Sequence, residues 1–395
     1  MTVKDKVQRA AAAAVLSRLI KYVRKDPDTN LVKLVDRSER FVGNIFPAKN
    51  FDSFREGAKD PENVWRQLAL RLIDEIDDNV LMNMMLALGL GAGVNGTKTV
   101  RANREKYHCN IPWVILLDPT SACNRKCKGC WSAEYGHKQS LTFDELNSIV
   151  NQGVAMGTHF YMFTGGEPLA NLESLQKMLD VIPTTHKVYI NTTFPVQTGF
   201  YTAEEMLDFT RRNRDKITCM NISRHLVKYV EESPDQVLGQ IACPTRINCV
   251  LYKKYPAEKL PQYVERFLPY GIPIQFRYDY TETTPENLYD QDHDPILQDL
   301  KRLFTYRGLD GCRMRNGFHF EYKGLHMTYH KTLPYSTIVE KGDDGVTYDI
   351  LYDILIKQNG EIHSDWTGVK MDVEKYRHVT FEPYDLRVLD GTVDF

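Results

Sequence analysis

The chain has 395 residues, of which 42% are hydrophobic and 26% are charged, a composition typical of a globular protein with a substantial core. Its formal net charge of −2 provides no basic field, so we expect no nucleic-acid partner. The eight cysteines are few and unevenly spaced, which argues against a secreted disulfide framework. No apolar run reaches about 18 residues, so the sequence predicts no transmembrane segment and a cytoplasmic protein with reduced thiols.

Residues 1–107 show helical patterns. Apolar residues recur at helical spacing from Val7 to Val23, which predicts a first helix that Asp26-Pro27 would end. Residues 1–25 carry far more basic than acidic side chains, and a basic amphipathic helix can lie on a membrane surface. We expect this helix to pack on the rest of the protein, with weak membrane-surface contact as the alternative.

Two further features of this region concern helix ends. Asp60-Pro61 combines an N-cap residue with a proline at the first helical position, so a second helix is expected to begin there. Gly89–Gly96 is rich in glycine, but a dinucleotide-binding loop would follow a strand, and no strand is expected before it. We therefore interpret this run as a helix end and linker.

From Ile111 onward, short apolar runs alternate with helical patterns, as in a parallel sheet covered by helices. The expected strands are Ile111–Leu117, His159–Phe163, Lys187–Asn191, Ile217–Ser223, Arg246–Tyr252 and Ile272–Tyr278. The expected helices are Thr142–Met156, Leu172–Ile182, Ala203–Arg214, Ala257–Leu268 and Pro295–Tyr306. Six such units predict an α/β fold, a partial (β/α)6 parallel barrel over residues 108–310, between a helical N-terminal region (1–107) and a C-terminal extension (311–395).

The extension alternates polar and apolar residues in the manner of antiparallel strands. Phe318–Tyr322 and Leu325–Tyr329 flank Lys323-Gly324, and Tyr348–Lys357 leads to Asn359-Gly360, a strong hairpin signal. Loops at the carboxyl ends of barrel strands carry function, so we expect the β-rich extension to cap that end of the barrel.

Cys123, Cys127 and Cys130 form a CX3CX2C triplet directly after the first expected strand. Three thiolates on one short loop can hold three corners of a four-iron cluster, whereas Fe–S clusters are normally held by four cysteine thiolates. The fourth iron would need a distant protein ligand or a non-protein ligand. Two alternatives are a zinc site, which usually requires four ligands, and three unrelated thiols.

Thr164-Gly165-Gly166-Glu167-Pro168 follows the second expected strand, and adjacent glycines allow a close backbone approach. Together with the triplet, this motif resembles the radical S-adenosylmethionine (radical SAM) superfamily over roughly residues 111–280. The resemblance implies a [4Fe–4S] cluster on the three cysteines, with S-adenosyl-L-methionine (SAM) on the open iron. It also implies reductive cleavage of SAM to a 5′-deoxyadenosyl radical, which abstracts hydrogen from an unidentified small polar substrate.

The resemblance further implies cofactor-binding residues and a partner. The candidates are small or polar residues at strand ends, and one aromatic residue: Gly165, Gly166, Glu167, Asn191, Ser223, Asn248 and Trp131. Many members carry an aromatic residue just before the third cysteine, where this chain has Gly129, so Trp131 is the candidate cover of the cluster or adenine. The implied partner is an electron donor of the flavodoxin or ferredoxin type.

The sixth expected strand alternates polar and apolar residues. If its polar set faces the barrel interior, Arg277 and Asp279 could hold a polar substrate and are the candidate catalytic residues. A solvated or ion-paired strand end is the alternative. Histidines recur in the extension, where substrate contact competes with an ordinary surface position; they are His319, His326, His330 and His363.

Two other functions remain open. One is the same chemistry on a lipid or membrane-associated substrate, for which the basic residues 1–25 provide the argument. The other is an Fe–S electron-transfer or sensor protein, which would need a fourth protein thiolate and would leave the Gly165–Pro168 motif unused. The remaining cysteines form no second cluster-like spacing; Cys243 and Cys249 are expected to be buried structural residues.

Overall fold

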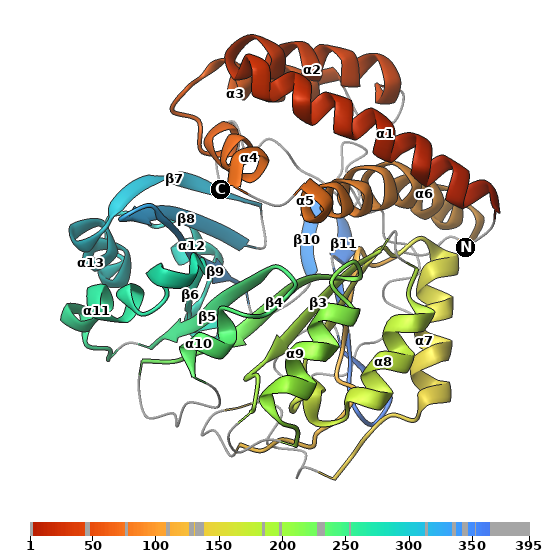
Figure 1. The fold of residues 1–395 in the computed structure, drawn as a ribbon, viewed down its shortest axis with the longest axis vertical. Helices are drawn as coiled ribbons and strands as arrows, with labels where there is room; N and C mark the ends of the chain where they lie inside the picture. Colours follow the sequence, from red (N-terminus) through yellow and green to blue (C-terminus); the bar gives the residue numbers. More distant parts are fainter. Residues whose placement is uncertain are drawn as a thin grey trace.

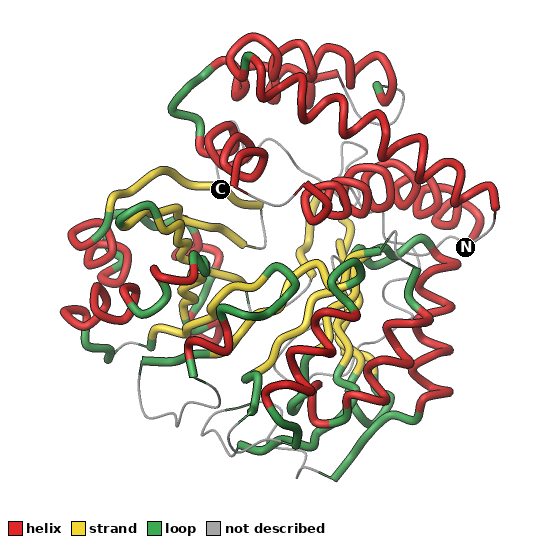
Figure 2. The backbone as a smooth tube through the Cα atoms, viewed as in Figure 1, coloured by secondary structure: helices red, strands yellow, loops and turns green. Residues whose placement is uncertain are grey.

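The computed structural model describes most of the chain. The described residues are 3–43, 48–75, 78–107, 111–125, 130, 138–183, 186–196, 200–226, 234–252, 254–312, 315–333, 337–341, 347–351 and 353–363. Strands form a central sheet with helices outside it, and a further group of helices lies at one end of the sheet (Figures 1 and 2). No helix in the described part is long and apolar enough to cross a bilayer.

The described elements of the N-terminal region are all helices. Its elements are α1 (Val3–Lys25), α2 (Pro27–Val42), α3 (Ala48–Lys59), α4 (Val64–Glu75), α5 (Asp78–Met85), a π-helix η1 (Leu86–Gly96) and α6 (Thr97–Tyr107). Helix α1 ends before Asp26 as expected, and Asp26 then caps α2 by accepting a hydrogen bond from the Thr29 amide. On α1, Ile20 and Val23 are buried, whereas Val7 and Val15 are exposed, so only its second half is packed along the expected stripe.

Two expectations in this region are wrong. The helix expected at Asp60-Pro61 begins at Val64, because Asn63 supplies the capping oxygen and accepts a hydrogen bond from the Arg66 amide. The Gly89–Gly96 run is not a linker but part of η1, which continues into α6. A side chain on Gly96 would lie 2.7 Å from Nδ1 of His159, so close packing explains a glycine here better than chain termination does.

In the described part of the chain, the main sheet has eleven strands in the order β13-β12-β1-β2-β3-β4-β5-β6-β9-β8-β7. The six strands expected from sequence are β1 (Val114–Leu117), β2 (Phe160–Phe163), β3 (Lys187–Thr192), β4 (Ile217–Ser223), β5 (Thr245–Leu251) and β6 (Ile274–Tyr278). They pair in parallel and in sequence order, and the sheet does not close, so the expected partial α/β barrel is confirmed.

Helices cover the outer face of this sheet, where α7, α8 and α9 are seen beside β3 and β4 (Figure 1). The α-helices are α7 (Phe143–Met156), α8 (Leu172–Val181), α9 (Ala203–Arg212), α10 (Asp235–Leu238), α11 (Leu260–Glu265), α12 (Pro285–Leu288) and α13 (Pro295–Leu303). Short 3-10 turns lie at η3 (Pro168–Ala170), η4 (Ala257–Lys259), η5 (Leu268–Tyr270) and η6 (Tyr280–Glu282). Capping boxes at Thr142 and Thr202 begin α7 and α9.

The C-terminal strands differ from the expected antiparallel cap. They are β7 (Thr305–Cys312), β8 (Arg315–Tyr322), β9 (Leu325–Thr332), β10 (Thr337–Lys341), β11 (Thr347–Leu351), β12 (Asp353–Ile356) and β13 (Ile362–His363). The hairpins around Lys323-Gly324 and Asn359-Gly360 form as expected. However, β9 pairs in parallel with β6, and β12 pairs in parallel with β1, so these strands widen the barrel wall on both sides. Whether residues 311–395 also cap the barrel stays a prediction, since 364–395 lie outside the described residues.

The two faces of the sheet differ in burial. In β3, Val188 and Ile190 face the helices and are buried in the main core, whereas Lys187, Tyr189 and Asn191 face inward and keep partial exposure. The same alternation occurs in β5 and β9. Barrel interiors are usually packed with branched apolar side chains. Here the inner face is polar and partly accessible to water, which leaves it available for a ligand.

Candidate functional site

The cysteine loop begins at the carboxyl end of β1 and is closed at its base by hydrogen bonds. The Ser121 amide donates to the Gln139 carbonyl at 2.8 Å, and the Gln139 amide donates to Oγ of Ser121 at 2.9 Å. Thr120 and Ser140 add a bridge, with their hydroxyls 2.7 Å apart. These contacts fix where the loop leaves and rejoins the barrel.

Two of the three cysteines of the triplet are described, and neither is in a disulfide bond. Cys123 and Cys130 are partly buried, and the Arg125 amide lies 3.4 Å from Sγ of Cys123 as a hydrogen-bond donor. An N–H directed at sulfur favours the thiolate, the form that binds metal. Cys127 and Trp131 lie outside the described residues.

The loop after β2 packs directly on the cysteine loop. The Gly166 amide donates to the Thr120 carbonyl at 2.9 Å, and the Glu167 amide donates to the Ala122 carbonyl at 2.8 Å. Gly165 has a φ of 96°, and a side chain on Gly166 would collide with the Ala122 carbonyl. The glycines are therefore needed for contact between the two loops, a role that sequence reasoning had not given them.

The Glu167 carboxylate is buried and fully engaged by protein donors. It accepts from Oγ1 of Thr192 at 2.5 Å, from the amide and Oγ1 of Thr193 at 2.8 Å each, and from the Leu169 amide at 3.0 Å. Burial raises the pKa of Glu167, while these donors oppose the shift. The side chain thus ties the end of β2 to the end of β3, and its carboxylate has little capacity left for a ligand.

A buried ion pair links the cysteine loop to the C-terminal part of the chain. Asp118, the first residue after β1, lies 3.8 Å from Nζ of Lys357, the first residue after β12, and both are essentially unexposed. The Asp118 amide also donates to the Ile356 carbonyl at 2.9 Å. Burial raises the pKa of Asp118 to about 8, although Lys357 opposes the shift. Sequence reasoning missed this pair, because nothing in the sequence indicates that β12 lies beside β1.

The other candidate cofactor residues lie at neighbouring strand ends. Asn191 on β3 accepts a 2.6 Å hydrogen bond from Nδ2 of Asn221 on β4. Ser223 on β4 is level with Asn248 on β5 in the strand register. The Oδ1 of Asn248 is buried and makes no hydrogen bond among the described residues, as expected of an acceptor that meets a ligand.

The two candidate catalytic residues have different surroundings. Arg277 lies on the inner face of β6, level with His330 on β9. Asp279, two residues later, caps the short η6 turn by accepting from the amide of Thr281 at 3.1 Å and from its hydroxyl at 2.8 Å. Asp279 is therefore occupied by its own turn, and no ion pair joins it to Arg277 in the described part of the chain.

Sequence reasoning overlooked several cations that accompany Arg277. Arg246 on β5 donates from Nε to Oδ1 of Asn221 at 2.5 Å and lies over the Tyr189 ring at 5.8 Å. Lys187 on β3 lies 5.3 Å from the centroid of the Phe160 ring. The alternation of Arg246 with buried Ile247 was visible in the sequence and could have indicated its inward position.

The histidines of the extension lie in two separate parts of the sheet: three are on β8 and β9, and His363 is on the edge strand β13. Nδ1 of His319 and Nε2 of His326 lie 3.0 Å apart on β8 and β9. Burial lowers the pKa of His330 well below its usual value, and Arg246, Arg277 and Arg315 add to this shift. His363 is buried on β13, with Nε2 3.4 Å from the Glu361 carboxylate.

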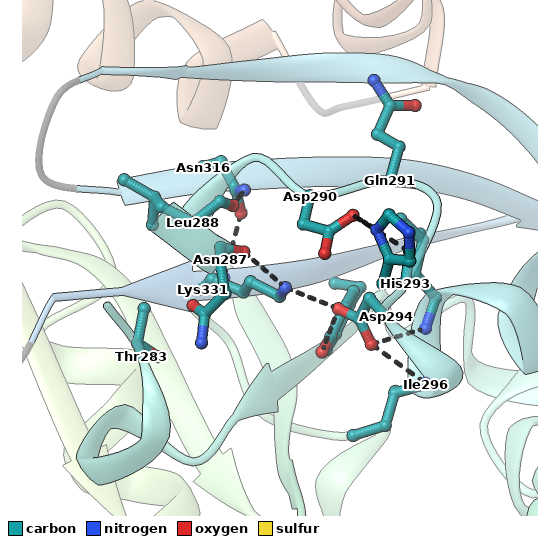
Figure 3. Close-up of polar contacts among 12 residues, drawn as sticks. Thr283, Asn287, Leu288, Asp290, Gln291, His293, Asp294, Ile296, Asn316 and Lys331 are labelled. Atoms are coloured by element: carbon teal, nitrogen blue, oxygen red, sulfur yellow. Dashed lines mark hydrogen bonds and ion pairs between the residues drawn. The ribbon is translucent and has the colours of Figure 1, made fainter. Parts of the chain in front are cut away.

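A buried polar network holds the outer side of β9 in place (Figure 3). Lys331 forms a 2.7 Å ion pair with Asp294, the residue that caps α13, and donates to the Asn287 carbonyl at 2.7 Å. Asp294 also accepts hydrogen bonds from the Ile296 amide and the Tyr329 hydroxyl. Since neighbouring residues on a strand point to opposite faces, this network fixes the inward position of His330.

The described cysteines outside the triplet do not gather into a second metal site. Cys243 and Cys249 are buried in the core, as expected, and burial raises the pKa of both thiols, for Cys249 to about 12. Protonated thiols are poor metal ligands. Their environment therefore contrasts with that of Cys123, which receives an N–H donor.

The fold and the site together define an α/β protein that presents a three-cysteine loop at the carboxyl ends of parallel strands. Residues 117–222 match the family model of the radical SAM superfamily. This part of the chain carries the radical SAM domain, and enzymes of that superfamily bind a [4Fe–4S] cluster and SAM.

Curated relatives match over part of their length. A GTP 3′,8-cyclase of Alkaliphilus oremlandii is 23% identical over 175 residues, which are 41% of this chain and 54% of that protein. One from Xanthomonas campestris pv. campestris is 27% identical over 183 residues, 41% of this chain and 52% of that protein. The chain thus spans about half the length of the curated relatives it matches.

Solved structures resemble the fold more distantly. Streptococcus suis SuiB bound to S-adenosylmethionine is 12% identical, with a TM-score of 0.47 over 80% of this chain and 74% of that chain. The anSMEcpe structure with bound AdoMet and the Cp18Cys peptide is 18% identical, with a TM-score of 0.33 over 42% of this chain and 51% of that chain.

The residues present fit the cofactors of this superfamily. Cys123 and Cys130 supply two thiols outside any disulfide bond on a loop whose base is fixed, and the third cysteine of the triplet lies between them in sequence. The unpartnered Oδ1 of Asn248 and the partly exposed Ser223 supply polar groups on the same end of the sheet. Cys123, Cys127 and Cys130 would therefore hold the cluster, with SAM beside the strand ends.

Proposed function

We propose that the protein is a radical SAM enzyme that cleaves SAM reductively and abstracts hydrogen from a small polar substrate. The bound cluster and SAM supply the radical chemistry. The chain's own residues hold the cofactors, position the substrate and exclude water. An electron donor of the flavodoxin or ferredoxin type would deliver the reducing electron.

The observation that carries this proposal is the direct contact between the two motif loops. The Gly166 and Glu167 amides donate to carbonyls of the residues just before Cys123, so the loop after β2 supports the cysteine loop. An electron-transfer or sensor protein has no evident need for this second loop. The contact therefore favours an open cluster position that a small molecule occupies.

The substrate would occupy the inner face of the sheet. That face is polar and partly exposed, and it lies directly beneath the carboxyl ends where the cysteine loop is anchored. Arg277 is the candidate positioning residue for the substrate, since its side chain lies on this face. Asp279 stays a weaker candidate because its carboxylate caps a turn. The relatives named GTP 3′,8-cyclase act on a nucleotide, which agrees with a small polar substrate.

Iron content and SAM cleavage test the proposal. Protein reconstituted anaerobically should bind about four irons per chain and, once reduced with dithionite, should release 5′-deoxyadenosine from SAM. Replacing Cys123, Cys127 and Cys130 by Ala should abolish both. The matched control is Cys243→Ala, because that thiol is buried in the core and should leave both intact.

Electron paramagnetic resonance separates the enzyme from the electron-transfer alternative. SAM should shift the spectrum of the reduced cluster, because it binds the open iron. Three results would contradict the proposed function. They are a spectrum that does not change when SAM is added, an iron content near eight per chain, and a cluster that survives the triple substitution.

A further inference from the structure

The inner face of strands β2 to β6 and β9 carries cationic side chains and no carboxylate; on β8, Glu321 shares the face of Arg315 and is paired with Arg307. Strands β2 to β6 and β9 are described in full and contain no acidic residue. Three cationic side chains on this face are Lys187 on β3, Arg246 on β5 and Arg277 on β6, and Arg315 on β8 lies within electrostatic reach of Lys187 and Arg277. A water-accessible cavity wall with one sign of charge attracts ligands of the opposite sign.

Arg277 is the most informative of these residues. Its guanidinium makes no hydrogen bond and no ion pair with the described residues, and its pKa is lowered to about 10 by burial and by Arg246 and Arg315. Arg277 keeps only partial exposure, and an anionic partner would stabilise a guanidinium that is partly removed from water, because an uncompensated charge there is costly. The charges that act on it, those of Arg246 and Arg315, are also positive and repel it. An anionic partner for Arg277 must therefore come from outside this group of side chains.

The neighbours of Arg277 are arranged around one region of the inner face. His330 on β9 is level with Arg277, and Gly317 on β8 is level with His330. Because residue 317 is a glycine, no side chain covers the inner face at this point of β8. Arg315, two residues earlier on β8, lies on the same face. Burial lowers the pKa of both His330 and Lys187, and the nearby cation Arg315 lowers it further at both residues.

We propose that this cationic face, formed by Arg246, Arg277, Arg315 and Lys187, binds the phosphate group of a soluble phosphorylated substrate. The inference rests on the proposed function and adds the chemical class of the substrate. Guanidinium groups match phosphate oxygens in bidentate geometry, and several such groups suit an anion with more than one charge. The inward position of the site favours a small soluble molecule over a lipid headgroup in a bilayer.

Tripolyphosphate is a suitable probe, because it carries the anionic group without a base, sugar or lipid. Binding is measured by calorimetry on anaerobically reconstituted protein. The wild type should bind it, and Arg277→Gln and Arg246→Gln should each weaken binding by roughly tenfold to one-hundredfold, the loss expected for a charge-assisted hydrogen bond. The matched control is Arg211→Gln, since Arg211 is exposed on α9 and paired with Glu204 at 2.9 Å.

Several outcomes would overturn the inference. They are no binding of tripolyphosphate by the wild type, equal binding by all variants, and binding of citrate as tight as that of tripolyphosphate. If the protein binds vesicles that contain phosphatidate but not tripolyphosphate, and Arg277→Gln weakens the vesicle binding, the site would be assigned to a lipid instead.

Formation of 5′-deoxyadenosine from SAM is measured on the same samples. Its loss would contradict the proposed function, whereas its retention without phosphate binding would contradict only the phosphate assignment.

Discussion

The Glu167 amide donates a 2.8 Å hydrogen bond to the carbonyl oxygen of Ala122, the residue directly before Cys123. The backbone after β2 therefore holds the backbone that begins the cysteine triplet. Because the contact is between main chains, it depends on the shape of the Gly165-Gly166 turn and not on any side chain. The glycine motif and the cysteine motif form one structural unit.

Gly166→Ala should reduce the iron content of the reconstituted protein. A Cβ at this position would meet the Ala122 carbonyl and lie 2.8 Å from the carbonyl carbon of Ser121, and both are backbone atoms that cannot rotate away. The expected result is well below four irons per chain and a weaker cluster absorbance. Gly89→Ala is the control, because a Cβ there meets nothing within 4 Å. Full iron content in Gly166→Ala would show that the loops separate without loss of the cluster.

Glu167→Gln should destabilise the fold by roughly 3 kcal/mol, measured by urea unfolding. The carboxylate accepts from Thr192, Thr193 and Leu169, whereas an amide would place its own NH₂ donor against some of these donors. The control Glu173→Gln removes only an exposed pair with Lys177 and should cost less than about 1 kcal/mol. Equal losses in both variants would contradict the clamping role of Glu167.

Much of the barrel could be predicted from sequence, because buried parallel strands leave apolar runs between amphipathic helices. The ends of β4 were predicted correctly, and those of the other five core strands lie within three residues of expectation. The partners of β9 and β12 could not be predicted, since an alternating strand has the same pattern beside a parallel or an antiparallel neighbour. The glycines of η1 were misread because the packing of Gly96 on His159 outweighs their low helix propensity.

Lys331→Met should destabilise the protein by about 3–5 kcal/mol, because it leaves Asp294 as an uncompensated buried carboxylate. The matched control lies on the same hairpin: Lys323→Met removes an exposed pair with Glu265 and should cost at most about 1 kcal/mol. Chemical denaturation curves give both values. A loss below about 1 kcal/mol for Lys331→Met would mean that water reaches Asp294.

Acid should destabilise the protein partly through His186. Burial and the stacked His159 ring, 4.0 Å away, lower the pKa of His186 to about 3, so the folded state keeps it neutral. The unfolded chain takes up a proton below pH about 6.5, so this contribution is complete above that pH and is lost as the pH falls. From pH 7.5 to 5.5 the wild type should lose about 1.4 kcal/mol more unfolding free energy than His186→Phe. Parallel pH profiles of the two proteins would refute this.

The candidate site was predictable where chemistry is local and not where it is assembled by the fold. The cysteine triplet and the glycine motif each lie within a short segment, so the residue types and their order in the sequence are enough to identify both motifs. The cationic face needs Lys187, Arg246 and Arg277 from three strands, and their common orientation follows only once the register is known. Asp118 and Lys357 are separated by most of the chain, and only β12 beside β1 brings them together.

The parallel pairing of β12 with β1 has a consequence for how the chain folds. The two strands are joined across more than two hundred residues, so the barrel wall next to the cysteine loop is among the most non-local parts of the structure. Such contacts form slowly, because a long loop must close before they contribute stability. A ribosome releasing this chain would expose β1 as an unpaired edge until the C-terminal strands arrive. Assembly of the cluster loop is therefore coupled to synthesis of β12, and a chain truncated after residue 310 should aggregate through the two exposed edges.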